Sequence, residues 1–332
     1  MCAPVDLGLQ EDFPETFFEW RSLSREIIES NPIWFLKNIW GVHGKGITLI
    51  SSWDEYQAIL KDPQFRQQDT RIEGPDGSKE YIADQFFLQR GMVNNHLVAE
   101  RKYCLRTFYL TIGDGRTFLF RDTLGYVHAG APFNKHDNSW NQHVSHYRAW
   151  AGEKDTREYF TMSIPTKLHT SPDGTVTTRE NPEPYPYEEV MGFMIAHSKK
   201  HSRIWGDVVA KSQAHPDPSA RLTSQHYQVW GCDYLVKDDL TAFLIEVNAY
   251  PNLNHDMAPR GSGPRPHEMA FRSQGFDRDV LRILGVDDCG AGWIGEPGSE
   301  PCLWEDVTDE ETRRSLPHIY SEAREPEPQP AQ

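Results

Sequence analysis

Two β-hairpins constrain the fold of this chain more than any other feature of its sequence. In the first, the strand-like runs YCLRTFYLTI and TFLFRDTLGYVHA flank the turn GDGR over residues 103–129. In the second, VWGCDYLV and AFLIEVN flank the polar turn KDDLT over residues 229–248. Both pairs are rich in β-branched and aromatic residues, so we expect long antiparallel strands at these positions.

Strands and helices are also predicted outside the hairpins. Two apolar runs surround a glycine-rich turn in IWFLKNIWGVHGKGITLI (33–50), and EYIADQFFLQ (80–89) reads as a further strand. Helical spacing occurs at three places: 52–62 after a capping serine, 190–209 with an interruption at the basic stretch SKKHSR (198–203), and 276–285, which ends on Gly285. This mixture predicts the α+β class.

Composition divides the chain into a main domain with two flanking segments. Residues 1–30 form a short acidic and aromatic lead-in, and residues 31–290 carry the predicted strands and helices. Within this domain, residues 151–187 are rich in Pro, Thr and Glu and are expected to form a long loop. Residues 291–332 are acidic and Pro-rich, so we expect a disordered tail.

Charge and cysteine content exclude several classes of function. The formal charge of −15 argues against a general nucleic-acid-binding protein. No apolar run approaches the ~18 residues of a membrane span, and the acidic N-terminus does not resemble a signal peptide. The five cysteines lack CxxC spacing, which indicates reduced thiols in a cytoplasmic protein and gives no zinc signal.

The second hairpin carries candidate metal ligands. Asp233 precedes its turn, and Glu246 and Asn248 follow it on one face of the returning strand. Two carboxylates and an amide oxygen form a set of hard oxygen donors that suits Mg²⁺. The alternative interpretation is the polar end of a buried strand.

Candidate phosphate contacts lie in two segments. Lys37 follows a strand and precedes a loop with Gly44 and Gly46, whose backbone amides could close over phosphates, although the order of residues is not that of a Walker A loop. Lys102 and Arg106 share one face of the first hairpin, and Arg121 lies on its returning strand. Gathering these cations is favourable only around an anion. The alternatives are a glycine-rich hairpin and a solvated strand face.

Taken together, these segments resemble the tubulin–tyrosine ligase and tubulin polyglutamylase/glycylase family, which has an ATP-grasp core. LIEVNAYPNL is similar to that family's LIEVNxSPS element, ERKYCLRTFYL to GRKFDLRxYVLV, and FLFRDTLGYVHAGAPF to YLYREGxxRFxxxPY. NQHVSHY falls where the family has xxHLTNY, and WFLKNIWGVHGKGI resembles WIxKPxxxGxGRGI. The order holds from about residue 33 to residue 285.

The resemblance implies a role for each candidate residue. Nucleotide contacts would come from a set that includes the loop over the phosphates and an adenine-binding hinge: Lys37, Gly44, Lys45, Gly46, Gln85, Phe86, Phe87 and Lys102. Arg106 would stabilise the transferring phosphoryl group, and Arg121 would hold phosphate or the acceptor carboxylate. Mg²⁺ would bind Asp233, Glu246 and Asn248.

The activity that the resemblance implies is an ATP- and Mg²⁺-dependent ligase that adds a free amino acid to a protein or peptide carboxylate through an acyl phosphate. The acceptor could be a tubulin C-terminal tail, in a cytoplasmic or cytoskeleton-associated setting. The alternatives are an ATP-binding protein with impaired catalysis and a ligase for a small, non-tubulin substrate. The acidic net charge disfavours an acidic acceptor tail, which the basic stretch at 198–203 could offset.

The chain departs from the family pattern at several positions. Cys104 replaces an aspartate, His146 replaces the asparagine of HLTN, and Asn38 stands where a proline usually follows the lysine. Asp84 and Gln85 replace the Gln–Lys of the hinge. The lead-in is short, so we expect an N-terminal domain that is reduced relative to the family.

Overall fold

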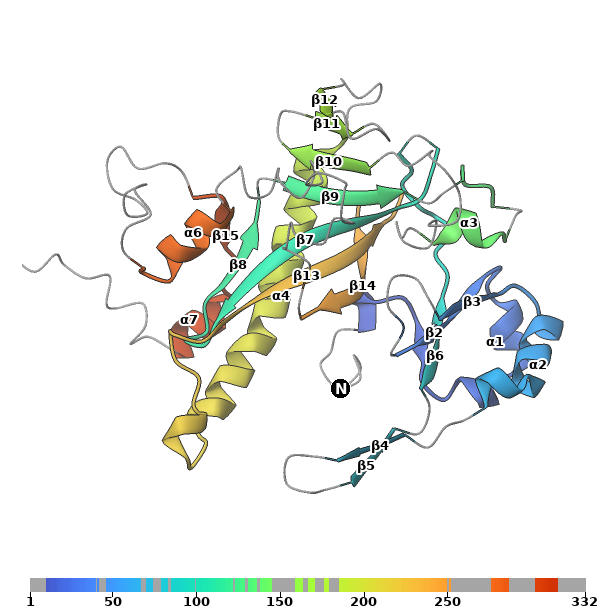
Figure 1. Ribbon diagram of the computed structural model, residues 1–332, viewed down its shortest axis with the longest axis horizontal. Coiled ribbons are helices and arrows are strands. Elements are labelled where there is room, and N and C mark those ends of the chain that lie inside the picture. The colour runs from blue at the N-terminus through green and yellow to red at the C-terminus, as the bar shows by residue number, and fades with distance from the viewer. Residues whose placement is uncertain are drawn as a thin grey trace, which may run out of the picture. The chain divides into compact units, whose positions relative to one another are not determined.

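The computed structural model divides the chain into two compact units, which we describe separately (Figure 1). Unit 1 comprises residues 1–105, 126–159 and 234–245, and unit 2 comprises residues 106–125, 160–233 and 246–332. The structure describes residues 10–39, 41, 46–66, 70–73, 79–82, 85–98, 100–121, 123–128, 131–135, 138–144, 159–163, 167–170, 176–178, 185–249, 251, 276–286 and 302–315.

Unit 1 contains a four-stranded antiparallel sheet in the order β1-β6-β2-β3. Its strands are β1 (Thr16–Phe17), β2 (Trp34–Asn38), β3 (Ile47–Ile50) and β6 (Phe86–Arg90). Short helices accompany it: η2 (Gln10–Asp12), η3 (Trp20–Ser22), α1 (Arg25–Glu29), α2 (Trp53–Lys61) and η4 (Pro63–Phe65). The core between them is aromatic and aliphatic, and it includes Trp20, Ile28, Trp34, Leu36, Tyr56, Phe65, Phe86 and Leu88.

The predicted elements of unit 1 are confirmed with one correction. Strands β2 and β3 pair as expected, and Ser52 caps α2 by accepting a hydrogen bond from the amide of Glu55 at 3.2 Å. The single strand predicted at 80–89 is wrong, because β5 (Lys79–Ile82) pairs with β4 (Thr70–Glu73) whereas β6 belongs to the four-stranded sheet. Alternation of apolar residues cannot show that a chain changes its pairing partner within one run.

A larger sheet of nine strands follows the order β12-β11-β10-β9-β7-β13-β14, with β8 between β7 and β15. Its strands are β7 (Tyr103–Ile112), β8 (Thr117–Phe120), β9 (Thr123–His128), β10 (Tyr159–Ser163), β11 (Lys167–Thr170), β12 (Val176–Thr178), β13 (Tyr227–Val236), β14 (Ala242–Asn248) and β15 (Trp304–Asp306). Both predicted hairpins are present: the amide of Ile112 donates to Arg116 at 2.9 Å, and that of Lys237 donates to Thr241 at 2.7 Å. The segment predicted as a long loop contains β10, β11 and β12, so that expectation is wrong for those residues.

Helix α4 (Tyr187–Gln213) covers one face of this sheet in unit 2. The Ser198 hydroxyl lies 2.6 Å from the Tyr109 hydroxyl, and the Trp205 indole donates to the Ile112 carbonyl at 2.7 Å. The helix is continuous, so the predicted interruption at 198–203 is wrong. Ser198 and Ser202 face the protein while Lys199 and Lys200 face solvent, which is the pattern of an amphipathic helix.

Helix α6 (Phe276–Ile283) packs in the core of unit 2. This core also contains Phe108, Leu110, Ile112, Phe118, Phe120, Val229 and Trp304. As predicted, α6 is followed by Gly285, which has a φ of 70° that an L-residue rarely adopts.

The expected disorder of the C-terminal tail is wrong for residues 302–315. Strand β15 pairs with β8 in the register Trp304↔Phe120, and α7 (Glu310–Ser315) follows it. Trp304 and Val307 are buried, and this burial offsets the polar composition that had suggested disorder. The remaining elements are α3 (Trp140–His143) and η6 (Pro218–Ala220).

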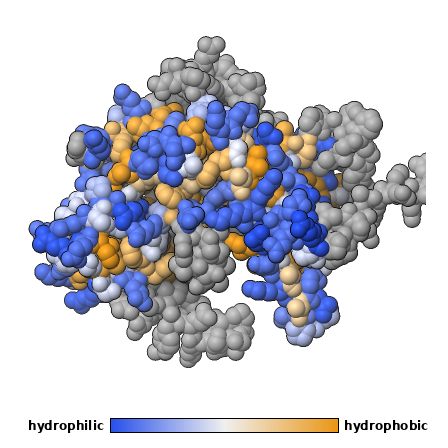
Figure 2. Space-filling model, turned by 180° about the vertical axis from the view of Figure 1, so that it is seen from behind, coloured by the Kyte–Doolittle hydropathy of each residue, from blue (hydrophilic) through white to orange (hydrophobic). Residues whose placement is uncertain are grey.

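The surface is mainly polar on the face drawn in Figure 2, with apolar residues visible between hydrophilic ones. Exposed large apolar side chains in the described ranges include Tyr227 and Val247. Isolated apolar residues of this kind are normal on a folded surface. Within the described part of the chain, no helix combines the length and the apolar character that crossing a bilayer requires.

Candidate functional site

A paired arginine and aspartate form the centre of the candidate site in unit 2. Arg106 lies on β7 and Asp233 on β13, which are neighbours in the sheet. The Nε and Nη2 atoms of Arg106 donate to the two carboxylate oxygens of Asp233, the second at 2.6 Å. Asp233 is only 7% exposed. A bidentate pair of this kind fixes both side chains on one face of the sheet.

A glycine and an asparagine complete this cluster. The side-chain Nδ2 of Asn248, on β14, donates to Oδ2 of Asp233 and to the Gly231 carbonyl, each at 3.5 Å. A Cβ atom at Gly231 would lie 2.7 Å from Cβ of Pro251 and 3.3 Å from Nη1 of Arg106, so a larger residue would clash with Pro251 and press on the guanidinium. Glu246 precedes Asn248 by two residues on β14 and is exposed. The structure therefore brings Asp233, Arg106 and Asn248 together.

Arg121 does not join this cluster. Tyr109 and Leu119 lie opposite each other in the β7–β8 register, and α4 covers the face of the sheet that carries Tyr109. Because side chains alternate along a strand, residue 121 shares this face with Leu119. Arg106 is three residues from Tyr109 on β7, so its side chain points to the other face. Arg121 forms ion pairs with Glu305 at 2.9 Å and with Glu188 at 3.8 Å. The expectation that all the cations of this hairpin gather around one anion is therefore wrong for Arg121.

Lys102 is a buried cation in unit 1. It is 3% exposed, and its Nζ donates to the Met92 carbonyl at 2.7 Å. Nζ also lies 3.0 Å from Nδ1 of His143 and 4.4 Å from the ring centroid of Phe133. Burial lowers the pKa of the Lys102 amine to about 7. Among the described residues, no carboxylate forms an ion pair with this amine.

The other predicted nucleotide contacts in unit 1 lie on β2 and β6. Nζ of half-buried Lys37 donates to Oε1 of Gln89 at 2.5 Å, and Gln89 donates to Thr16 at 3.2 Å. Gly46 has a φ of 78° and its carbonyl accepts from the amide of Asn38 at 2.9 Å. Gly44 and Lys45 lie outside the described residues.

The predicted hinge lies at the start of β6. The carbonyl of Gln85 accepts from the amide of Ile39 at 2.8 Å, which ties the hinge to the end of β2. Phe86 is buried in the core of unit 1, and the ring of Phe87 lies 5.9 Å from that of Phe18. The side chain of Phe86 is therefore part of the core. Its main-chain groups remain candidates for binding a base.

Two residues that contact the candidates, His143 and Glu305, were not predicted from the sequence. His143 touches Lys102, and the only sequence signal for it was its place in NQHVSHY. Glu305 pairs with Arg121 from a segment that composition had suggested was disordered. Contacts between segments so far apart in the chain have no local sequence signature.

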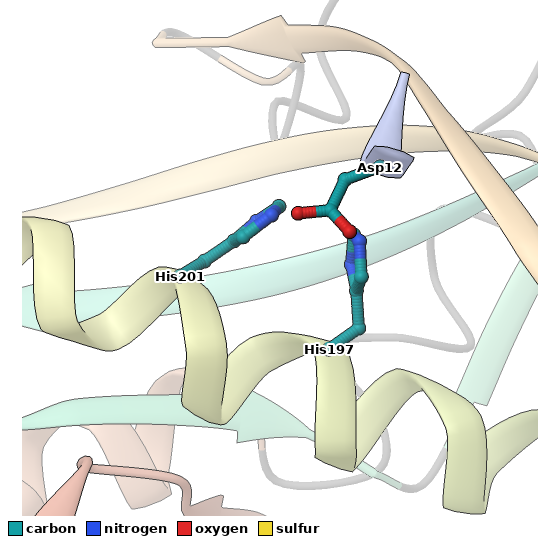
Figure 3. A group of neighbouring side chains, drawn as sticks. All are labelled: Asp12, His197 and His201. Atoms are coloured by element: carbon teal, nitrogen blue, oxygen red, sulfur yellow. The ribbon is translucent and has the colours of Figure 1, made fainter. Parts of the chain in front are cut away.

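Helix α4 also carries two histidines one turn apart, His197 and His201, whose rings project from the same side of the helix (Figure 3). Their ring centroids lie 4.2 Å apart, and His197 stacks on Phe193 at 5.4 Å. Asp12, also drawn there, belongs to the other unit. Two imidazoles are fewer ligands than the three or four that proteins supply to zinc, and we assign this pair no function.

Comparison with models of known protein families identifies a match. The model of the family described as Tubulin-tyrosine ligase family matches residues 9–260, which is more than half of the chain. No curated protein matches the chain. The matched range includes Lys37, Lys102 and the Arg106–Asp233–Asn248 cluster, whereas α6, β15 and α7 lie beyond it.

Proposed function

Because the chain belongs to the tubulin–tyrosine ligase family, whose members are ATP-dependent ligases, we propose that it joins a protein or peptide carboxylate to the amine of a free amino acid on an ATP-grasp core. The observation that carries this proposal is the cluster of Arg106, Asp233 and Asn248 on one face of the larger sheet. A buried carboxylate, an amide and a guanidinium side by side are suited to a metal and a phosphoryl group.

The donor set fits Mg²⁺, which ligases of this family use together with ATP. Asp233, Glu246 and Asn248 would hold it, because two carboxylates and one amide offer hard oxygen ligands. Asp233 Oδ1 accepts from Arg106 alone, whereas Oδ2 accepts from both Arg106 and Asn248, so Oδ1 keeps a lone pair that can bind a cation. When bound, Mg²⁺ would neutralise charge on the phosphates.

The residues of this chain would act mainly by position and charge. In the proposed reaction, a carboxylate oxygen of the acceptor attacks the γ-phosphorus of ATP, which gives an acyl phosphate and ADP. The amine of the amino acid then attacks the acyl carbon, phosphate leaves, and the amine loses a proton. Arg106 would stabilise charge on the transferred group, while Lys37 and Lys102 would hold phosphates. We assign Arg121 no role in these steps, because its ion pairs with Glu305 and Glu188 already balance its charge.

The test measures ADP release by the full chain with a panel of carboxylate acceptors and amino acids. Glu246→Gln should reduce turnover by about 10²–10³-fold, because one electrostatic contact is lost, and it should keep the thermal unfolding transition because Glu246 is exposed. Glu189→Gln, an exposed acid on α4, is the matched control and should leave the rate unchanged.

The outcomes separate the proposed activity from its alternative. An unchanged rate in Glu246→Gln would refute the assignment of the site. If ATP binds tightly but no pair of substrates supports ADP release, the chain is an ATP-binding protein with impaired catalysis rather than a ligase.

A further inference from the structure

We propose that His143 is the positioning residue of Lys102: it holds the amine in place for phosphate and exchanges a proton with it, so that nucleotide binding draws a proton into unit 1. This inference rests on the proposed function, because it takes phosphate to be the anion that Lys102 meets. It adds a residue to the site and predicts how the site responds to pH.

The structure holds the His143 ring in a fixed position. His143 is the last residue of α3. On either side of it along the chain, Trp140 and Val144 pack with Ile33 and Phe35 in a small apolar cluster. The ring itself meets Phe35 edge-on, with centroids 6.1 Å apart. A ring fixed in this way can respond to Lys102 by changing its tautomer without leaving its place.

The contacts of Nζ allow both protonation states of Lys102. The charged amine donates to the Met92 carbonyl and to an unprotonated Nδ1 of His143, at 2.7 and 3.0 Å. The neutral amine can instead accept a hydrogen bond from Nδ1–H. An imidazole serves both states because either ring nitrogen can carry the proton.

The surroundings of Nζ make the proton exchange sensitive to an anion. His143 is the titratable side chain that the described contacts place against it, and the other contacts are the Met92 carbonyl and the face of the Phe133 ring. Since burial alone lowers the pKa of Lys102 to about 7, the amine is mostly neutral at pH 8. An anion placed beside it favours the charged form, so binding takes up a proton from solvent.

Titration of free protein tests the role of His143 without any nucleotide. NMR of chains labelled at the lysine Cε carbon should show one resonance with a midpoint near pH 7, assigned by its absence in Lys102→Arg. His143→Leu leaves the charged amine with fewer acceptors and should lower this midpoint. His143→Gln, which can present either its oxygen or its N–H, should restore it. His96→Gln is the matched control, because His96 contacts Tyr103 at 2.9 Å rather than the Lys102 amine, and it should leave the midpoint unchanged.

Calorimetry then tests the coupling to nucleotide. ATP binding at pH 8 is measured in two buffers that differ in their enthalpy of ionisation, and the wild type should take up close to one proton more than Lys102→Arg, whose guanidinium stays charged. The Kd of the wild type relative to that of Lys102→Arg should rise about tenfold per pH unit above pH 7.5. The comparison with Lys102→Arg removes the titration of ATP itself.

The possible results distinguish failure of this inference from failure of the proposed function. ATP that binds without extra proton uptake, or a midpoint that stays the same in His143→Leu, would overturn the inference and leave the ligase proposal standing. A chain that does not bind ATP would overturn the proposed function, and with it the identity of the anion.

Discussion

Gly231 shows how one missing side chain positions the candidate site. A Cβ atom there would meet Pro251 at 2.7 Å and the guanidinium of Arg106 at 3.3 Å. We therefore expect Gly231→Ala to lower the free energy of unfolding by about 1–3 kcal/mol through overpacking, and to lower the rate of ADP release by displacing Arg106. Urea denaturation and the ligase assay measure the two effects.

Gly192 is the matched control for that substitution. It is exposed on α4, and a Cβ atom there would meet nothing within 4 Å. Because glycine inside a helix is less favourable than alanine, Gly192→Ala should raise the free energy of unfolding by about 0.5–1 kcal/mol. A loss of stability at this position as large as at Gly231 would show that the steric argument is wrong.

The buried amine of Lys102 should make the free energy of unfolding depend on pH. Burial lowers its pKa to about 7, so between pH 7 and pH 10 the unfolded chain binds a proton that the folded chain does not. The free energy of unfolding therefore rises with pH in this window, by about 1–2 kcal/mol from pH 7 to pH 8.5. Lys102→Met should remove this rise. A parallel pH dependence in the two proteins, measured by chemical denaturation, would contradict the predicted pKa.

At the scale of elements, α6 depends on one buried carboxylate. Asp279 is fully buried and accepts hydrogen bonds from Arg282 at 3.0 Å, Arg278 at 2.9 Å and the amide of Leu303 at 2.8 Å. It thus links α6 to the segment that leads into β15. Asp279→Ala should reduce the free energy of unfolding by about 3–5 kcal/mol, because it leaves a buried arginine without this partner.

The control for Asp279 is Asp207→Ala on α4, an exposed position that should change stability by less than about 0.5 kcal/mol. Thermal unfolding of both variants compares the two sites. Equal shifts would mean that the carboxylate of Asp279 does not hold α6.

The basic stretch of α4 also has its explanation at this scale. Arg203 forms ion pairs with Glu311 of α7 at 3.1 Å and with Asp309 at 3.8 Å. This arginine is therefore engaged within unit 2 although it is exposed, as Lys199 and Lys200 also are. Because exposed ion pairs contribute little, the stretch keeps its helix through the buried face rather than through these charges.

On the scale of the whole molecule, residues 302–315 belong to the folded part of unit 2. Trp304 packs against Phe120 and Phe276 at 5.2 and 4.9 Å between ring centroids, and Val307 is fully buried. A chain that ends at residue 301 should therefore unfold at lower denaturant concentration than the full chain. A chain that ends at residue 315 keeps these contacts and is the control. Equal midpoints for all three would show that this segment adds no stability.

The sequence alone was sufficient for the features that depend on neighbouring residues. Alternation and turn residues predicted both long hairpins, the capping serine predicted α2, and Gly285 predicted the end of α6. The order of the motifs also predicted the family, because each motif is a short local pattern. The match to the family model confirms this prediction. Asp233 and Asn248 were placed together by hairpin geometry, and they do lie together.

Tertiary structure decided what depends on pairing partners and on the faces of the sheet. The register of β7 and β8 separates Arg121 from Arg106, and α3 brings His143 to Lys102. Burial of Trp304 orders a segment whose composition suggested disorder. In each case the deciding contact joins residues far apart in the chain. Its energy comes from desolvation and packing that no local pattern encodes.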